Sequence, residues 1–192
     1  MFEFLNDIDT SLFLYLNGLN HPWVDPIMVF ITGKFSWIPL YAALLAVFIW
    51  KYKWQTVMIL LVIAILIALS DQLSVKAFKF VFERPRPCHE PDLMPYIHLP
   101  AGKCGGAYGF VSSHAANSFA LAGFVYLLFR SWFRSVGYFT FGWATLVSYS
   151  RIYVGVHYPG DIVAGALLGL IVALVVYFVF RLADQNLCKT NC

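Results

Sequence analysis

Long apolar stretches separated by short polar segments dominate the chain. Residues 55–82 and 162–180 are long enough to approach the roughly 20 apolar residues that a helix needs to cross a bilayer. Residues 112–129 and 136–154 predict two further helices, the first with a polar beginning. Four small residues of the last stretch would let a neighbouring helix approach closely: Ala164, Gly165, Ala166 and Gly169. The pattern predicts an all-α, polytopic membrane helix bundle.

The first 50 residues divide less clearly into helices. Residues 2–19 mix acids with Phe and Leu at roughly helical spacing, which is typical of an amphipathic helix at a membrane surface. Residues 23–50 are apolar but interrupted at Gly33 and Lys34. They fit either one long kinked span or a short re-entrant piece followed by a short span, and the pattern leaves both open.

Residues 83–111 are rich in Pro and Gly and show no helical or strand periodicity. Because this loop is too polar for lipid, we expect it outside the membrane or folded over a site at its surface. The positive-inside rule places the basic turns at residues 51–53 and 130–134 in the cytoplasm, with Trp50, Trp54 and Trp132 as interface anchors. The loop and residues 150–161 then share the outer face.

Composition narrows the class of protein. Of 192 residues, 60% are hydrophobic and 12% are charged, which is far more apolar than a soluble domain. A net charge of +3 from scattered residues argues against a nucleic-acid partner. Acids at Glu3, Asp7 and Asp9 stand where a signal peptide has its basic region, so we expect no cleaved signal peptide. One membrane domain over residues 1–192 is the expected organisation.

Three polar clusters lie at the ends of predicted helices, on one face of the bundle. They are Lys79 to Pro87, Ser112 to His114, and Arg151 to Asp161. Each alone has a structural explanation: basic residues anchor spans, Ser caps helices, and His is often hydrated at an interface. Unpaired polar groups are costly in an apolar chain, so three such clusters on one side indicate a functional site.

The residue types fit phosphoryl transfer without a metal. His157 can attack phosphorus, Asp161 can orient its imidazole, and His114 can protonate the departing oxygen. The candidate phosphate ligands are Lys79, Arg86, Ser112, Ser113 and Arg151. Because no Asp, Glu and His residues have the spacing of a metal site, we expect no metal or other cofactor, and activity that survives EDTA.

The three clusters together resemble the signature of the type 2 phosphatidic acid phosphatase (PAP2) superfamily. Its first part, Lys-x6-Arg-Pro, is met by Lys79, Arg86 and Pro87; the overlapping Arg84-Pro85 is out of register. Its second part, Pro-Ser-Gly-His, is met in part by Val111-Ser112-Ser113-His114. Its third part, Ser-Arg-x5-His-x3-Asp, is met by Ser150, Arg151, His157 and Asp161.

The resemblance implies a phosphohistidine intermediate on His157, an acid role for His114, and phosphate binding by the remaining residues. It also implies a core of about six transmembrane helices, two of which would come from the region before Trp50. The expected enzyme is a bacterial inner-membrane, multi-pass lipid phosphatase whose active site faces the periplasm.

Members of this family act on undecaprenyl pyrophosphate, phosphatidylglycerophosphate, phosphatidic acid or the phosphates of lipid A. The short chain and small extramembrane mass favour undecaprenyl pyrophosphate, by analogy and not from any residue. A phospholipid-binding or transport protein, or a vanadate-binding haloperoxidase, could carry the same basic pocket. The expected partners are a lipid phosphate and the bilayer, and the oligomeric state stays open.

The outer loop holds two cysteines, Cys88 and Cys104. A periplasmic location would allow a disulfide between them, stabilising the loop by about 3 kcal/mol. His89, His98 and Lys103 are candidates for a second phosphate contact, with a merely solvated role as the simpler explanation.

Asp71 stands in the apolar stretch of residues 55–82, outside the three clusters. An ion pair with Lys76 or Lys79 is its simplest explanation.

Overall fold

The computed structural model describes residues 2–33 and 35–191, and side chains within residues 4–184 of these ranges. Within these ranges the secondary structure is helical, apart from one isolated β-bridge between Pro85 and Tyr108. The α-helices are α1 (Phe2–Gly18), α2 (Asp25–Ile31), α3 (Ile38–Tyr52), α4 (Gln55–Gln72), α5 (Phe80–Phe82), α6 (Ser113–Phe129), α7 (Val136–Tyr153) and α8 (Pro159–Asn191). A π-helical segment, Leu73–Lys79, joins α4 to α5, and the outer loop contains short 3₁₀ turns at Pro87–His89 and Met94–Tyr96.

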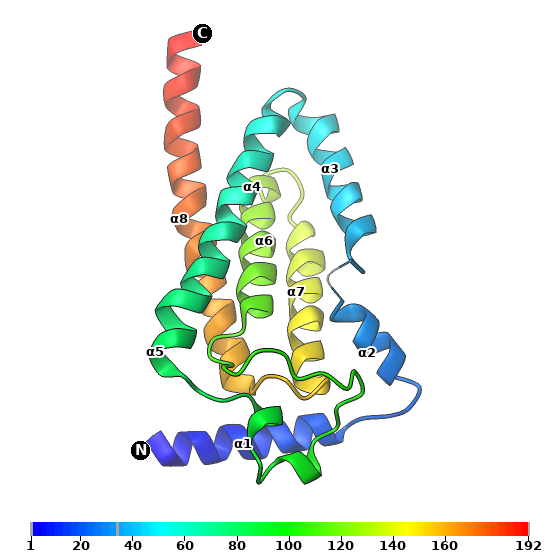
Figure 1. Cartoon of the computed structure of the whole chain (residues 1–192). Helices are drawn as coiled ribbons and strands as arrows, with labels where there is room; N and C mark the ends of the chain where they lie inside the picture. Colours follow the sequence, from blue (N-terminus) through cyan, green and yellow to red (C-terminus); the bar gives the residue numbers. More distant parts are fainter. Residues whose placement is uncertain (1, 34, 192) are drawn as a thin grey trace.

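Helix α1 lies across one end of the bundle and not along it (Figure 1). Phe13 is fully buried and packs edge-on against Tyr158, with 5.4 Å between ring centroids. The Asn17 amide donates to the backbone oxygens of Ile152 and Tyr153 at 3.1 and 2.8 Å. Other apolar side chains of α1 stay exposed: Phe4, Leu5, Ile8, Leu12 and Tyr15. The expected helix is present, with one face docked and an apolar face left free.

The apolar region of residues 23–50 is divided into two helices. Helix α2 ends at Ile31, and α3 begins only at Ile38, with Pro39 in its first turn. Seven residues make α2 about 10 Å long, and 15 residues make α3 about 22 Å long. Of the two arrangements left open by the sequence, the short piece followed by a short helix agrees with this break.

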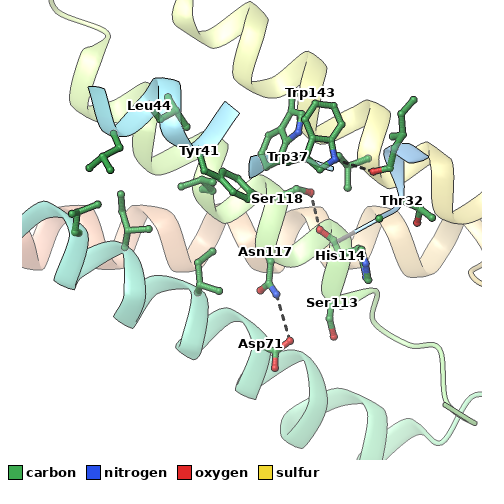
Figure 2. Close-up of a pocket in the computed structure, with 18 of the residues that line it drawn as sticks. Thr32, Trp37, Tyr41, Leu44, Asp71, Ser113, His114, Asn117, Ser118 and Trp143 are labelled. Atoms are coloured by element: carbon green, nitrogen blue, oxygen red, sulfur yellow. Dashed lines mark hydrogen bonds between the residues drawn. The ribbon is translucent and has the colours of Figure 1, made fainter. Parts of the chain in front are cut away.

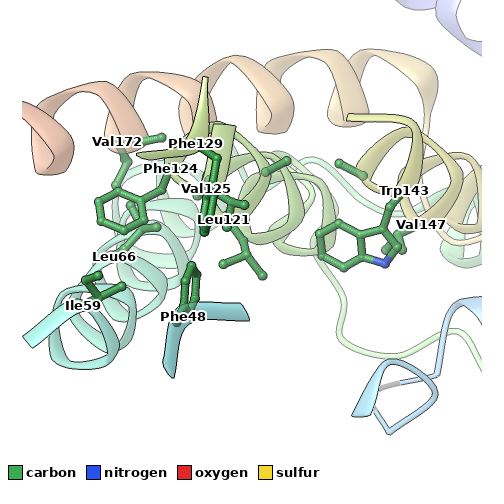
Figure 3. Packing of buried hydrophobic residues seen from close by; sticks show 14 of the residues in the cluster. Phe48, Ile59, Leu66, Leu121, Phe124, Val125, Phe129, Trp143, Val147 and Val172 are labelled. Carbon is green, nitrogen blue, oxygen red and sulfur yellow. The ribbon is translucent and has the colours of Figure 1, made fainter. Parts of the chain in front are cut away.

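Helix α6 packs closely on α8 through small residues. A Cβ atom on Gly169 would lie 2.2 Å from the Ala116 oxygen, and one on Gly165 would lie 2.6 Å from the Ser112 oxygen. No side chain fits at either position, so the predicted close approach is confirmed and its partner is α6. Phe48, Leu66, Phe124 and other apolar residues of α3, α4, α6, α7 and α8 fill the core around this pair (Figure 3).

In the described part of the chain, two helical segments are long and apolar enough to cross a membrane, Gln55–Phe82 with 28 residues and Pro159–Asp184 with 26. Helices α3 and α6 are shorter apolar helices. Large apolar side chains point outward from the two long segments, among them Leu61, Ile65, Val175 and Phe178. The outer loop, α1 and the α7–α8 connection gather at one end of the bundle, opposite the two basic turns (Figure 1). This end holds all three polar clusters.

Candidate active site

A buried His–Asp pair lies where α7 passes into α8. His157 stands in the short connection between these helices, and Asp161 stands in the first turn of α8. The His157 Nδ1 and Asp161 Oδ2 atoms are 3.2 Å apart, and the two residues are only 1% and 0% exposed. The backbone N–H of Tyr158 donates to the same carboxylate oxygen at 3.1 Å. Because an ionised carboxylate only accepts, Nδ1 carries the proton and Nε2 keeps its lone pair.

The surroundings of His157 keep its imidazole neutral. Burial lowers the pKa of His157 well below its ordinary value of 6.5, and the nearby charges of Arg86, Arg151 and Lys79 lower it further. A backbone hydrogen bond with Gly109 acts in the opposite direction. The unprotonated ring is the nucleophilic form of an imidazole, so His157 has the protonation state that attack on phosphorus would require.

The three basic candidates come from three different elements. Lys79, at the end of the π-helical segment, donates to the Ser113 hydroxyl at 2.9 Å. Arg151 of α7 donates from Nη1 to the Thr32 hydroxyl, and its Nε is buried without a hydrogen-bond partner in the described chain. Arg86 is held by the outer loop, as described below. All three influence the same imidazole, so the structure brings together the cations that the sequence predicted.

The start of α6 completes the surroundings of the His–Asp pair. The Ser112 hydroxyl caps this helix by accepting from the Ala115 N–H at 3.5 Å, and the Ser112 N–H donates to the Asp161 backbone oxygen at 3.0 Å. Ser113 and His114 follow in the first turn, where backbone N–H groups and the helix dipole favour an anion. The hydroxyl of Ser112 is thus used in capping, whereas that of Ser113 is bonded to Lys79.

Arg84 was not among the candidate site residues, yet it bonds directly to the buried pair. Its Nη1 donates to Asp161 Oδ1 at 3.1 Å and pairs with Asp9 Oδ2 at 2.8 Å. Asp9 also accepts from the Gly160 N–H at 2.7 Å, so α1 is tied to the first turn of α8. The repeated Arg-Pro of residues 84–87 was the available signal, but the motif register drew attention to Arg86 alone.

Arg86 stands near the start of the outer loop, and its side chain bonds to backbone oxygens near the end of the loop. It donates from Nη1 to the Cys104 oxygen at 3.0 Å and from Nε to the Tyr108 oxygen at 3.2 Å. A disulfide joins Cys88 to Cys104, with 5.8 Å between their Cα atoms. Arg86 lies two residues before Cys88, so the disulfide joins the chain next to Arg86 to the part of the loop that holds its acceptors.

The other loop residues considered for a second phosphate contact differ in their surroundings. His98 bonds through Nε2 to Asp25 at 2.8 Å, and its backbone N–H donates to Asn17, so it joins the loop to α1 and α2. His89 lies near the Gly105 oxygen at 3.4 Å, and Lys103 is exposed. His98 thus has a structural role, and nothing brings His89 or Lys103 to the His–Asp pair.

An apolar groove of about 640 Å³ opens beside His114 (Figure 2). It runs between α3 and α4 on one side and α6 and α7 on the other, and its lining is mostly Leu, Ile, Phe and Trp. Ser113, His114, Asn117 and Asp71 supply polar groups at one part of its wall. The groove is large and apolar enough for a lipid tail, and Ser113 and His114 of the predicted site stand in its wall.

Asp71 does not form the ion pair expected with Lys76 or Lys79. No Asp71 ion pair occurs among the described residues, and its Oδ1 instead accepts from Asn117 Nδ2 at 3.4 Å. The described residues also contain no cluster of three His, Cys, Asp or Glu side chains that could hold a metal ion.

A family model described as the PAP2 superfamily matches residues 57–184, which is two thirds of the chain. The chain belongs to the PAP2 superfamily. The resemblance drawn from the three motifs is therefore confirmed.

Several relatives of this PAP2 protein are named phosphatases. A lipid A 4'-phosphatase of Bacteroides thetaiotaomicron is 40% identical over 93% of this chain and 80% of its own. A lipid A 4'-phosphatase of Porphyromonas gingivalis is 38% identical over 99% and 80%. An undecaprenyl-diphosphatase of Sulfolobus acidocaldarius is 32% identical over 84% and 73%. The expected class of enzyme, a phosphoric monoester hydrolase, is confirmed. The relatives named for lipid A are more similar to this chain than the one named for undecaprenyl diphosphate.

Two solved structures share the fold. A transmembrane PAP2-type phosphatidylglycerolphosphate phosphatase of Bacillus subtilis superposes with a TM-score of 0.68, at 22% identity, over 92% of this chain and 86% of its own. LpxE of Aquifex aeolicus superposes with a TM-score of 0.62, at 25% identity, over 87% and 93%. These neighbours and the two long apolar helices identify a membrane protein.

Proposed function

We propose that this protein is a lipid phosphatase that hydrolyses a phosphate of lipid A by a metal-independent phosphohistidine mechanism. The observation that carries the proposal is a buried His–Asp pair, surrounded by three cations, next to an apolar groove. The similarity to lipid A 4'-phosphatases supports lipid A over undecaprenyl pyrophosphate, our first expectation. Phosphatidylglycerophosphate and phosphatidic acid remain alternative substrates.

In the first step, the Nε2 lone pair of His157 attacks phosphorus in line with the sugar oxygen. The N–P bond forms as the P–O bond to the sugar breaks, and Asp161 stabilises the positive charge that develops on the imidazole. Three cations and the start of α6 bind the equatorial oxygens: Lys79, Arg86, Arg151, Ser112 and Ser113. His114 gives a proton to the departing oxygen, so the lipid leaves as an alcohol.

In the second step, water attacks the phosphohistidine and breaks the N–P bond. His114, which has lost its proton, accepts one from the attacking water. Inorganic phosphate leaves, and both histidines return to their initial protonation states. Two histidines thus divide the nucleophilic and acid–base roles, and no step needs a metal.

The topology we propose is one multi-pass domain over residues 1–192 in the bacterial inner membrane. Helices α3, α6, α7, α8 and the continuous α4–α5 helix would cross the bilayer. The sixth span that the family implies would have to come from the first 31 residues. There α1 lies across the bundle end, and the 7 residues of α2 are too few to cross.

Loop 83–111 and the site would face the periplasm in this topology. An amine reagent that does not cross membranes, applied to intact spheroplasts, should then modify exposed Lys103 and spare exposed Lys53. The opposite labelling would place the site in the cytoplasm.

Phosphate release by the purified chain in detergent and EDTA tests the function. The substrates are lipid A, undecaprenyl pyrophosphate, phosphatidic acid and phosphatidylglycerophosphate. His157→Ala should lower release by about 10³-fold or more, because it removes the nucleophile. His89→Ala is the matched control, since this loop histidine is exposed and lies near the Gly105 oxygen, with no hydrogen bond to the pair. Release from lipid A that is indifferent to His157 would refute the mechanism.

A phospholipid-binding or transport protein would behave differently in the same experiment. It would release no phosphate from any of the four lipids. It would also keep its lipid affinity in the His157→Ala variant, because binding needs the cations and not the nucleophile.

A further inference from the structure

Two polar side chains stand in the wall of the apolar groove, beside the site but outside the catalytic motifs. Asp71 continues a stripe of α4 that otherwise consists of Leu60, Ile63 and Ile67, and Asn117 lies one turn along α6 from His114 (Figure 2). Three residues of helix place Asn117 about 4.5 Å deeper than His114 along the axis of α6. The proposed mechanism gives neither of them a role.

Hydrogen bonding in this part of the groove is incomplete. The Asn117 Oδ1 atom is buried and has no partner in the described chain. Its Nδ2 reaches Asp71 only at 3.4 Å. On the neighbouring helix α7, the Trp143 Nε1–H, which also lines the groove, is likewise buried without a partner in the described chain. An unpaired buried acceptor and an unpaired buried donor each carry a cost, which a ligand with both types of group would remove.

We infer that Asp71 and Asn117, with Trp143, form a specificity site that binds a hydroxyl or amide group of the substrate close to its scissile phosphate. This inference deepens the proposed function and rests on it. The chemical class is an acylated sugar phosphate, whose chains begin with amide or ester groups and carry hydroxyls. An isoprenoid diphosphate offers only hydrocarbon at that depth, and it would leave the Asn117 oxygen and the Trp143 N–H unpaired.

The specificity site should distinguish lipid A from the other lipids by their hydrogen-bond donors, not by their size. Phosphatidic acid brings two ester carbonyls and no hydroxyl or amide donor near its phosphate. It could satisfy Trp143 but not the Asn117 oxygen. Lipid A can satisfy both, so the three lipids should rank as lipid A, phosphatidic acid and undecaprenyl pyrophosphate in kcat/KM.

Asn117→Leu tests the site because it keeps the side-chain volume and removes the amide. We expect kcat/KM for lipid A to fall about tenfold or more and that for undecaprenyl pyrophosphate to stay within about twofold. Ser118→Ala is the matched control, since Ser118 lines the same groove but bonds through its hydroxyl to its own helix, at 2.7 Å from the His114 oxygen. The Ser118→Ala variant should leave kcat/KM for both substrates unchanged.

Asp71→Leu is the second variant and should shift the same ratio in the same direction. Melting temperatures of all variants, measured without lipid, separate a folding defect from a specificity change. An equal fall for both lipids, or no fall for either, would overturn the inference while leaving the proposed function intact.

Binding to the inactive His157→Ala protein gives an independent measurement. Lipid A should raise its melting temperature more than undecaprenyl pyrophosphate does, and Asn117→Leu should abolish the difference. If kcat/KM of the wild-type chain and the melting shift of the His157→Ala protein both favour the isoprenoid, the specificity site and the proposed substrate fail together, although the phosphatase mechanism would stand.

Discussion

Removal of the loop disulfide should weaken catalysis through Arg86. Besides its two side-chain bonds to the loop, Arg86 donates its backbone N–H to the Ala107 oxygen at 3.1 Å. Each of these bonds joins Arg86, just before the segment that the Cys88–Cys104 bond closes, to the end of that segment or to residues just after it. The two cysteines are separated by 16 positions in the sequence. Closing such a loop lowers the conformational entropy of its open state, which stabilises the closed loop by about 3 kcal/mol of free energy. Without the disulfide, substrate binding has to supply part of that ordering.

The expected fall in kcat/KM lies between about tenfold and a hundredfold. The upper limit corresponds to the full 3 kcal/mol, because 1.4 kcal/mol is a factor of ten. The assay compares phosphate release by oxidised and reduced protein, with Cys188 and Cys192 replaced by Ser. In the Cys88→Ser/Cys104→Ser variant, activity should be low and indifferent to reductant.

A double-mutant cycle identifies the route of the effect. If the disulfide acts by holding Arg86, then reduction should cost little more once Arg86→Ala has been made. Fully additive losses would show that the disulfide acts elsewhere. Equal kcat/KM values for oxidised and reduced wild-type protein would refute the reasoning altogether.

Three further predictions concern the His–Asp pair and its supports. The acid limb of kcat/KM should have its midpoint below pH 6.5, because the lowered pKa of His157 keeps its imidazole neutral at more acidic pH; a midpoint above 7 would contradict this. Gly169→Val should lower the free energy of unfolding by about 1–3 kcal/mol, measured in denaturant, whereas Gly142→Val, which meets nothing within 4 Å, should cost less than about 1 kcal/mol. Asp9→Asn should reduce kcat several-fold, because Asp9 holds Arg84 in place beside Asp161. Asp7→Asn, at an exposed position of the same helix, should leave kcat unchanged. Equal losses in the two variants would show that the negative charge of α1 matters and not the Asp9–Arg84 contact.

The His157–Asp161 pair could be predicted because its two residues are close in sequence. His157 and Asp161 are four residues apart, so a single helix start determines their contact. The long apolar segments likewise predicted α4–α5 and α8. In these cases the helical repeat and the cost of burying charge are enough to identify the element and its polar end.

Other parts of the site depend on contacts that no local pattern encodes. Arg84 meets Asp161 across 77 positions, and Asp9 meets Gly160 across 151. The sequence predicted α1 from its periodicity, but its docking against the α7–α8 connection depends on Phe13 and Asn17 finding their partners. The preference for undecaprenyl pyrophosphate rested on chain length, which carries no information about the polar groups in the groove.

The α6–α8 contact links the interior of the bundle to the chemistry at its end. The Ser112 N–H bonds to the Asp161 backbone oxygen, and Gly165 lies one turn further along α8 against the Ser112 oxygen. The two helix starts are therefore held at one fixed separation by small residues that touch no substrate. Because Asp161 sets the tautomer of His157, a bulky side chain at Gly165 should displace the nucleophile as well as the helix. Activity should then be lost before the fold is, which is the reason to measure kcat and stability on the same packing variants.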